Sequence, residues 1–158
     1  IKILKIFLLM IKNIEIERLS FAKDIPLPSY NSNNCSGLDL YAANKKDITI
    51  KSGKVEIIPS GIKILLKKNL EGQIRPRSGL AKKFGITVLN SPGTIDEDYR
   101  GEIKIILINH GKYDFVVQRG MRIAQLVVSK VEKIGWNEKK KIKLNTKRNE
   151  SGFGSTGL

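Results

Sequence analysis

The sequence predicts an all-β fold, a jelly-roll-like β-sandwich or barrel with one short helix. Three observations predict it: the β-branched apolar runs are many and short, turn residues separate them, and a single segment suits a helix. A length of 158 residues indicates one domain, and the chain shows no internal repeat at a fixed period.

The first predicted strand covers residues 14–19, where apolar and charged residues alternate. Two prolines, Pro26 and Pro28, and the Ser- and Asn-rich run 29–37 predict a loop after it. The later predicted strands are short runs of mostly apolar, often β-branched residues, at 38–43, 47–50, 55–58, 62–66, 71–75, 86–89, 103–108, 115–117, 123–128 and 130–131.

The helix is predicted at SGLAKKFG, residues 78–85. Ser78 is a residue type that caps helix N-termini, and Gly85 suits the position just after the last turn.

These patterns divide the chain into three parts. Residues 1–13 are expected to form an N-terminal extension. The apolar run 1–9 is short and no small-residue cleavage site follows it, so we interpret it as an upstream extension rather than a signal peptide. Met10 is then the expected natural start. Residues 14–135 are expected to form the β jelly-roll domain. Residues 136–158 form a flexible C-terminal arm, because the apolar pattern ends near Trp136 and the last stretch is rich in glycine and serine. Trp136 itself is interpreted as a packing or interface residue.

The composition excludes several classes of protein. No apolar run is long enough to span a bilayer, so no membrane partner is expected. The lone Cys35 suits a reducing, cytoplasmic compartment and excludes a cysteine-ligated metal. With His110 as the only histidine, zinc chemistry and a Ser-His hydrolase are both disfavoured.

The net charge of +14 admits two explanations. Basic proteins often bind polyanions, and a positive field also suits a small polyphosphate ligand. The lysines are scattered, however, with one dense cluster at 139–141, and the chain is rich in Ile, Lys and Asn. We therefore favour genomic base composition over dedicated nucleic-acid binding.

The segment PGTIDEDYRGE, residues 92–102, predicts a polar hairpin at the mouth of a strand. Such a loop can hold a small ligand over a rigid scaffold, although a solvated surface turn is an equally simple interpretation. Asp96 is the leading acid for activating an attacking water, with Glu97 and Asp98 as rivals on chemistry alone.

Two other segments suit phosphate. RPRSG, residues 75–79, offers two guanidinium groups, a hydroxyl and backbone N–H groups at a helix start; the alternative is two surface arginines and a cap. The C-terminal tail offers Arg148, glycines, Ser155 and Thr156, and its lone Phe153 could stack on a nucleobase; the alternative is disordered filler. Asp39 is a further acid, with a turn residue as its alternative.

With these segments in hand, the chain resembles the trimeric-type dUTPases (deoxyuridine triphosphate nucleotidohydrolases). The five ordered motifs of that family match CSGLDLYAA (35–43), RPRSGLA (75–81), NSPGTIDEDYRGE (90–102), GMRIAQLVV (120–128) and RNESGFGSTG (148–157). The resemblance runs from about Leu27 to the C-terminus. It departs from the family at Asn149 and Ser151, where glycines are usual, and at Met121, where a polar or acidic residue is frequent.

The resemblance implies a homotrimer whose active sites are shared between subunits, and Mg²⁺-assisted hydrolysis of dUTP to dUMP and pyrophosphate. Water attacks the α-phosphorus, and the reaction limits uracil incorporation into DNA and supplies dUMP for thymidylate synthesis. One chain supplies the hairpin, a neighbour the RPRSG segment and a third the tail.

The resemblance also implies a role for each matching residue. Asp96 activates the water, Tyr99 packs under the deoxyribose, and Asp39 lies near the waters of the metal. The residues implied in uracil binding are Asn90, Gly93, Thr94 and Ile95. Those implied in phosphate binding are Arg77, Ser78, Gly79 and Gln125. Those implied in the tail that stacks on uracil and clamps the γ-phosphate are Arg148, Phe153, Gly154, Ser155 and Thr156.

Two alternatives remain open at this point. A dCTP deaminase-like nucleotide enzyme has the same fold, but the GFGSTG tail and the hairpin favour the hydrolase. A basic nucleotide- or RNA-binding protein would instead show salt-sensitive RNA binding without dUTP turnover.

Overall fold

The computed structural model of the chain describes residues 13–142 and Thr146. The predicted roles of residues 1–12, and of Arg148, Phe153, Gly154, Ser155 and Thr156 in the tail, lie outside the described residues. The strands are β1 Glu15–Arg18, β2 Leu38–Tyr41, β3 Ile48–Ile50, β4 Val55–Pro59, β5 Ile62–Leu65, β6 Leu70–Arg75, β7 Ile86–Val88, β8 Gly93–Ile95, β9 Lys104–Asn109, β10 Phe115–Val117 and β11 Arg122–Lys130.

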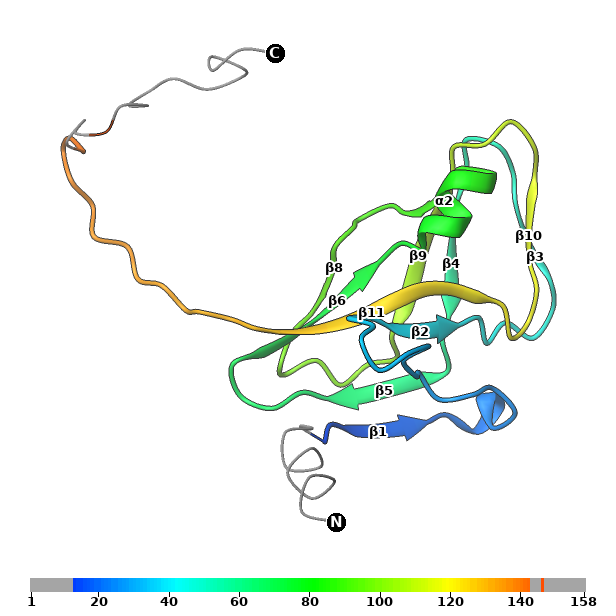
Figure 1. Cartoon of the computed structure of the whole chain (residues 1–158), viewed down its shortest axis with the longest axis horizontal. Helices are drawn as coiled ribbons and strands as arrows, with labels where there is room; N and C mark the ends of the chain where they lie inside the picture. Colours follow the sequence, from blue (N-terminus) through cyan, green and yellow to red (C-terminus); the bar gives the residue numbers. More distant parts are fainter. Residues whose placement is uncertain (1–12, 143–145, 147–158) are drawn as a thin grey trace.

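The described part is all-β with one short α-helix, as predicted, and its strands pair antiparallel in four sheets (Figure 1). The largest sheet has the order β2-β11-β6-β8, and a second has the order β4-β9-β7. Two further pairs, β1-β5 and β10-β3, complete the arrangement. The long strand β11 pairs with β2 on one edge and with β6 on the other. It therefore brings together two predicted site segments: residues 35–43, which contain β2, and residues 75–79, which begin at the end of β6.

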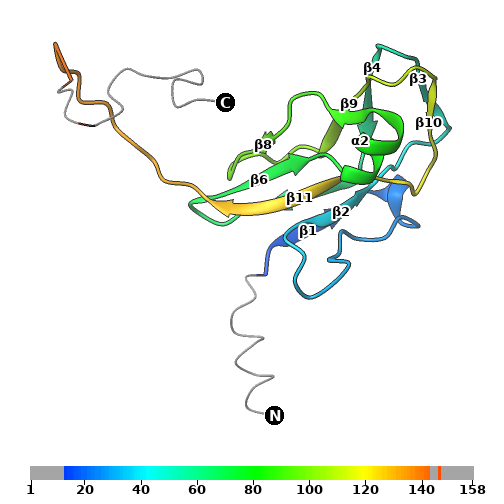
Figure 2. The same cartoon turned by 45° about the horizontal axis from the view of Figure 1, so that its top comes forward.

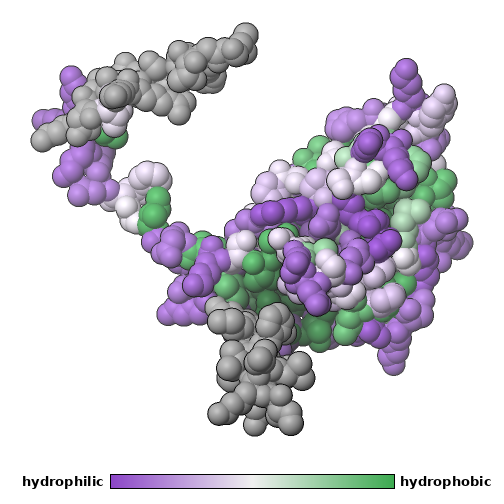
Figure 3. All heavy atoms as spheres, viewed as in Figure 1, coloured by the Kyte–Doolittle hydropathy of each residue, from purple (hydrophilic) through white to green (hydrophobic). Residues whose placement is uncertain are grey.

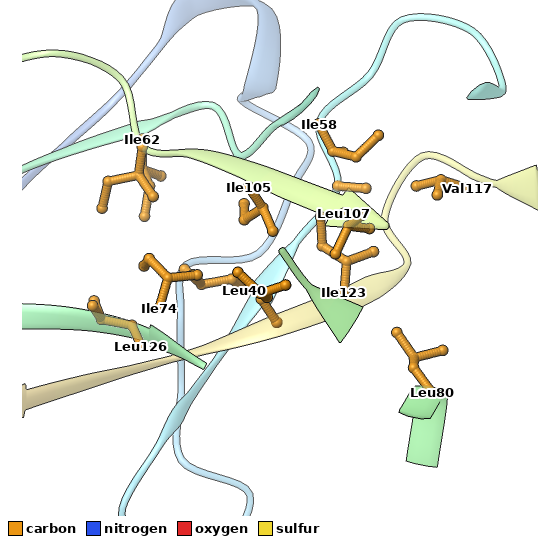
Figure 4. Packing of buried hydrophobic residues seen from close by; sticks show 14 of the residues in the cluster. Leu40, Ile58, Ile62, Ile74, Leu80, Ile105, Leu107, Val117, Ile123 and Leu126 are labelled. Carbon is orange, nitrogen blue, oxygen red and sulfur yellow. The ribbon is translucent and has the colours of Figure 1, made fainter. Parts of the chain in front are cut away.

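The core lies between the two larger sheets and follows the period of two expected of strands. Along β9, Ile105 and Leu107 are fully buried, while Lys104 points to solvent. Figure 4 shows these side chains meeting Ile74, Leu40 and others from facing strands.

Leu107 anchors this core, and its truncation gives a first prediction. Leu107→Ala is expected to lower the free energy of unfolding by about 2–5 kcal/mol, because it leaves a cavity in a close-packed interior. The half-exposed Leu65 on β5 is the matched control, and Leu65→Ala should cost roughly 1 kcal/mol or less. Urea denaturation at one protein concentration measures both; equal losses would contradict this description of the core.

The helix α2, Ser78–Phe84, lies at one end of the larger sheet, where Leu80 packs into the core. Gly85 ends it with φ 69°, in the left-handed region, as predicted. The predicted cap is wrong, however: Arg77 holds the N-cap position, no side chain caps it, and Ser78 is the first helical residue.

Three other details differ from the sequence prediction. Residues 93–95, expected in a turn, form strand β8 paired with β6, because Gly93 fits closely against Ile74. The expected strands 123–128 and 130–131 are one strand, since Ser129 pairs with Glu71 in an unbroken register. A 3₁₀ turn, η1 Ser20–Ala22, was not predicted, because its stability comes from a distant residue.

That residue is Arg119, which binds the N-terminal segment to the domain. Its Nε and Nη2 atoms donate to both carboxylate oxygens of Asp24, at 2.9 and 2.6 Å. The same guanidinium donates to the backbone oxygens of Phe21, Ala43 and Asn44. The hydrogen bonds from Arg119 lower the pKa of the Asp24 carboxyl.

Beyond β11 the described chain continues to residue 142 without a helix or strand and runs away from the sheets (Figure 2). Trp136, in this stretch, is 92% exposed, so it makes little contact with the other residues that the structure describes. The predicted interface role of Trp136 stays a prediction.

Among the described residues no helix has both the length and the apolar character to cross a membrane. Hydrophilic side chains cover much of the visible face, and hydrophobic side chains show between them, most clearly in the lower part of the domain (Figure 3).

Candidate active site

The predicted site residues lie in two separate pockets of the single chain. The first, here called the hairpin pocket, has a volume of about 340 Å³, and its lining includes Asn90, Gly93, Thr94, Ile95, Asp96 and Tyr99. The second, the arginine pocket, has about 300 Å³, and its lining includes Asp39, Arg77, Ser78, Gly79 and Gln125. The two pockets share no lining residue.

The floor of the hairpin pocket depends on Gly93 in β8. A Cβ atom there would lie 3.2 Å from Asn90 Nδ2 and 3.3 Å from Ile74 Cβ, so a larger residue would displace the Asn90 amide. Asn90 follows β7 and is exposed, with its amide beside the β8 backbone. A polar amide and strand backbone over apolar residues suit a flat, hydrogen-bonding ring such as a nucleobase.

The structure separates the three rival acids of the hairpin. Asp96 lines the pocket, is exposed, and its carboxylate has no hydrogen bond or ion pair among residues 13–142. Glu97 instead accepts a 2.7 Å hydrogen bond from Asn69 N and lies 3.5 Å from Lys133 Nζ. The hydrogen bond from the Asn69 N–H lowers the pKa of Glu97. The Glu97 carboxylate therefore binds the turn that precedes β6. Asp98 does not line the pocket, and Glu102, which does, accepts a hydrogen bond from Gly61 N, so of the three rivals only Asp96 has a carboxylate at the pocket that is unpaired among the described residues.

Tyr99 closes the hairpin end of this pocket. Its hydroxyl donates a 2.9 Å hydrogen bond to the backbone oxygen of Glu102, and its side chain is 42% exposed. The ring therefore presents a fixed face to anything bound in the hairpin pocket.

The arginine pocket is organised around the buried carboxylate of Asp39 in β2. Arg77 Nε donates to Oδ1 at 3.0 Å, and Arg122 Nη1 donates to Oδ2 at 3.1 Å. Asn31 Nδ2, from the predicted loop, adds a third bond of 2.9 Å to Oδ2. Asp39 thus holds two guanidinium groups at the pocket and is more than a turn residue.

Arg77 keeps donors free for a ligand despite this pairing. Its Nε binds Asp39 and its Nη1 donates to Arg122 O at 3.2 Å, whereas Nη2 has no partner among the described residues. Ser78 and Gly79 occupy the first turn of α2, where backbone N–H groups lack intrahelical acceptors. Gln125 donates to Pro76 O at 3.3 Å and so lies against the same segment. Together these groups suit a phosphate chain.

Sequence reasoning missed three residues of these networks. Asn31 and Arg122 hold Asp39, and Glu102 accepts the Tyr99 hydroxyl. Arg122 lies three residues before Gln125 in the fourth motif, and that position was the only signal for it. Asn31 belongs to a loop whose composition alone predicts solvent exposure.

The residues present fit a magnesium ion only in part. The described chain contains no group of three or more His, Cys, Asp or Glu side chains that could form a metal cage. Mg²⁺ commonly keeps several waters and binds one or two carboxylates together with substrate phosphates, which needs no such cage. Asp39 is the acid that lines the arginine pocket, and because both its oxygens already accept hydrogen bonds, a contact through water is the kind left to it.

Comparison with known proteins finds the same family among models and relatives. The dUTPase family model matches residues 23–157. The deoxyuridine 5′-triphosphate nucleotidohydrolase of Rickettsia bellii is 60% identical over 132 residues, which are 84% of this chain and 87% of that protein. The enzyme of the same name from Rickettsia massiliae is 58% identical over 132 residues, 84% of this chain and 88% of its own.

Solved structures show the same jelly-roll-like fold. A dUTPase of Staphylococcus bacteriophage 80alpha, described with dUpNHpp, has a TM-score of 0.83 at 19% identity and covers 94% of this chain and 100% of its own. A dUTPase from phage phi11 of S. aureus, described with a structural Mg(II) ion, has a TM-score of 0.74 at 16% identity. It covers 84% of this chain and 99% of its own. At these identities the likeness concerns the fold alone.

Proposed function

The chain belongs to the dUTPase family, and from this premise we propose that it hydrolyses dUTP to dUMP and pyrophosphate at a site shared between subunits. In the cell this reaction would limit uracil incorporation into DNA and supply dUMP for thymidylate synthesis. The names of the curated relatives favour this hydrolase over a dCTP deaminase.

One observation carries the proposal: the free carboxylate and the phosphate-binding donors lie in different pockets of the same chain. A triphosphate nucleotide needs both an acid at its α-phosphorus and cationic donors along its phosphates. A homotrimer would unite them by placing the hairpin pocket of one subunit against the arginine pocket of its neighbour. In this arrangement residues 14–135 are the catalytic domain and residues 136–158 the arm that closes over a neighbouring site.

In the hairpin pocket, Asn90 and the β8 backbone of Gly93, Thr94 and Ile95 bind uracil, and Tyr99 packs under the deoxyribose. Asp96 orients a water and accepts its proton as the water oxygen attacks the α-phosphorus. The bond from this phosphorus to the bridging oxygen breaks, and pyrophosphate leaves.

In the arginine pocket, Arg77 and the N–H groups of Ser78 and Gly79 stabilise the charge that develops on the phosphates. Gln125 supports the same segment. Mg²⁺, held through water near Asp39, would neutralise part of the triphosphate charge. The tail residues Arg148, Phe153, Gly154, Ser155 and Thr156 would then cover the bound nucleotide. No nucleic-acid or membrane partner is proposed, and a cytoplasmic location agrees with the nucleotide substrate.

The test is pyrophosphate release with Mg²⁺, run in parallel on dUTP, dTTP, dCTP and UTP. We expect turnover of dUTP alone. Adding EDTA should abolish this activity, and excess Mg²⁺ should restore it. Ammonia release from dCTP would favour the deaminase. Absence of turnover with all four nucleotides would overturn the proposal and favour salt-sensitive RNA binding.

The arm gives a further prediction. Truncation after Asn145 is expected to lower kcat/KM for dUTP by about 10²-fold or more, because the site would no longer be closed against water. The described core is built from residues before the arm, so the truncated chain should keep its trimer in sedimentation analysis. A truncated chain that sediments as a monomer would contradict this assignment of the arm.

A further inference from the structure

The ring of Tyr99 packs directly on Gly101, two residues along the chain. A Cβ atom at Gly101 would meet the Tyr99 hydroxyl and would lie 2.6 Å from Cζ and 3.0 Å from Cε2. Its three nearest neighbours are all atoms of this one ring. Gly101 does not have a positive φ, so its backbone would accept alanine. The ring is therefore the obstacle to a side chain at this position.

The hydroxyl end of the ring is fixed as well. Tyr99 donates its hydrogen bond to the carbonyl of Glu102, and the next residue, Ile103, is fully buried. Ile103 N donates to Ile62 O at 2.9 Å, which ties this stretch to β5. The acceptor for Tyr99 thus lies at the end of the hairpin segment, where it joins the buried core.

The side chain of Glu102 adds a second attachment. Its Oε1 accepts a 2.9 Å hydrogen bond from Gly61 N in the β4–β5 turn. Gly61 has φ 69° and packs on Ala22 and Ala43, so this turn cannot shift easily. The backbone from Tyr99 to Glu102 is consequently held against two strands and the N-terminal segment.

We propose that Gly101 and Glu102 are positioning residues that set sugar specificity, by holding the Tyr99 ring where it excludes a 2′-hydroxyl. The inference rests on the proposed function, in which Tyr99 lies under the deoxyribose. UTP differs from dUTP by one hydroxyl group, so an enzyme that rejects UTP needs a rigidly held group beside the 2′ carbon of the sugar. Gly101 leaves the space that the ring occupies, and Glu102 accepts the Tyr99 hydroxyl through its carbonyl and binds Gly61 N through its side chain.

The test is the ratio of kcat/KM for dUTP to that for UTP. Gly101→Ala is expected to lower this ratio by about tenfold, because the new methyl group displaces the ring. Gly135→Ala is the matched control: its added Cβ meets nothing within 4 Å, and the ratio should not change. An unchanged ratio in Gly101→Ala would overturn the proposal.

A double-mutant cycle separates the ring contact from general damage to the loop. If the methyl acts through the ring, adding Gly101→Ala to Tyr99→Ala should leave the ratio unchanged. An equal fall in both backgrounds would overturn the inference. Should Gly101→Ala not fold, Tyr99→Phe removes only the bond to Glu102 and should lower the ratio about fivefold; no change there would also overturn it.

These outcomes are distinct from a failure of the proposed function. If the unaltered protein hydrolyses dUTP and UTP equally, Tyr99 does not exclude ribose and the proposed placement of the sugar is wrong. If the unaltered protein prefers dUTP and the variants prefer it to the same extent, only the role of Gly101 and Glu102 is wrong.

Discussion

Replacing Asp96 by asparagine is expected to lower kcat for dUTP hydrolysis by about 10²–10⁴-fold, the usual contribution of a positioned general base. Asparagine keeps the shape of the side chain but cannot accept the proton of the attacking water. Because the Asp96 carboxylate has no partner within residues 13–142, the change breaks no contact of the fold. Binding of a non-hydrolysable dUTP analogue should therefore remain near normal.

The control for Asp96→Asn is Asp98→Asn, which alters a nearby exposed acid outside the hairpin pocket. Its rate should stay close to that of the unaltered protein. Steady-state pyrophosphate release and equilibrium binding of the analogue measure the two effects separately. A near-normal rate for Asp96→Asn would show that another group activates the water.

Replacing Arg77 by alanine is expected to lower kcat/KM by about 10²–10³-fold, the cost of losing one preorganised donor to the reacting charge. It should also destabilise the fold by about 1–3 kcal/mol, because Oδ1 of the buried Asp39 loses its donor. Asp96→Asn should not share this second effect, so activity and thermal unfolding together distinguish the two sites.

The matched variants for Arg77→Ala are Arg77→Lys and Arg75→Ala. Lysine keeps the positive charge but lacks the planar guanidinium group, whose several N–H donors can bind Asp39 and a phosphate at the same time. An intermediate rate is therefore expected for Arg77→Lys. Arg75 is exposed at the end of β6, donates to Gln73 and does not line the arginine pocket, so its loss should matter little. A larger loss of activity in Arg75→Ala than in Arg77→Ala would contradict the proposed role of Arg77.

The fold could be predicted largely from local patterns, because strand periodicity and turn residues act over short distances. The predictions failed where a distant contact decided the structure. Strand β8 depends on its register against β6, and η1 depends on Arg119 of a remote turn. Neither partner is visible in the local sequence.

The site could be predicted less completely, for a similar reason. The motif residues were identified by type and spacing, but spacing did not show that Asp39 binds both Arg77 and Arg122. Glu97 and Asp96 have similar chemistry, and they are separated by the contacts of Glu97 with Asn69 and Lys133 and by the place of Asp96 in the pocket lining. Since Arg77, Arg122 and Asn69 are far along the chain from their partners, their roles emerge only in the folded protein.

The most direct test of the account mixes two inactive variants. If the hairpin pocket of one subunit works with the arginine pocket of its neighbour, Asp96→Asn and Arg77→Ala subunits can complement each other. Random refolding of equal amounts into trimers should leave about a quarter of the sites intact. Each variant refolded alone is the control.

Recovery of roughly a quarter of the normal rate on mixing would establish that the two pockets act across a subunit boundary. Differently tagged subunits that co-purify would prove that mixed trimers had formed. Mixed trimers without recovered dUTP hydrolysis would contradict the central claim, because each active site would then need Asp96 and Arg77 from the same chain.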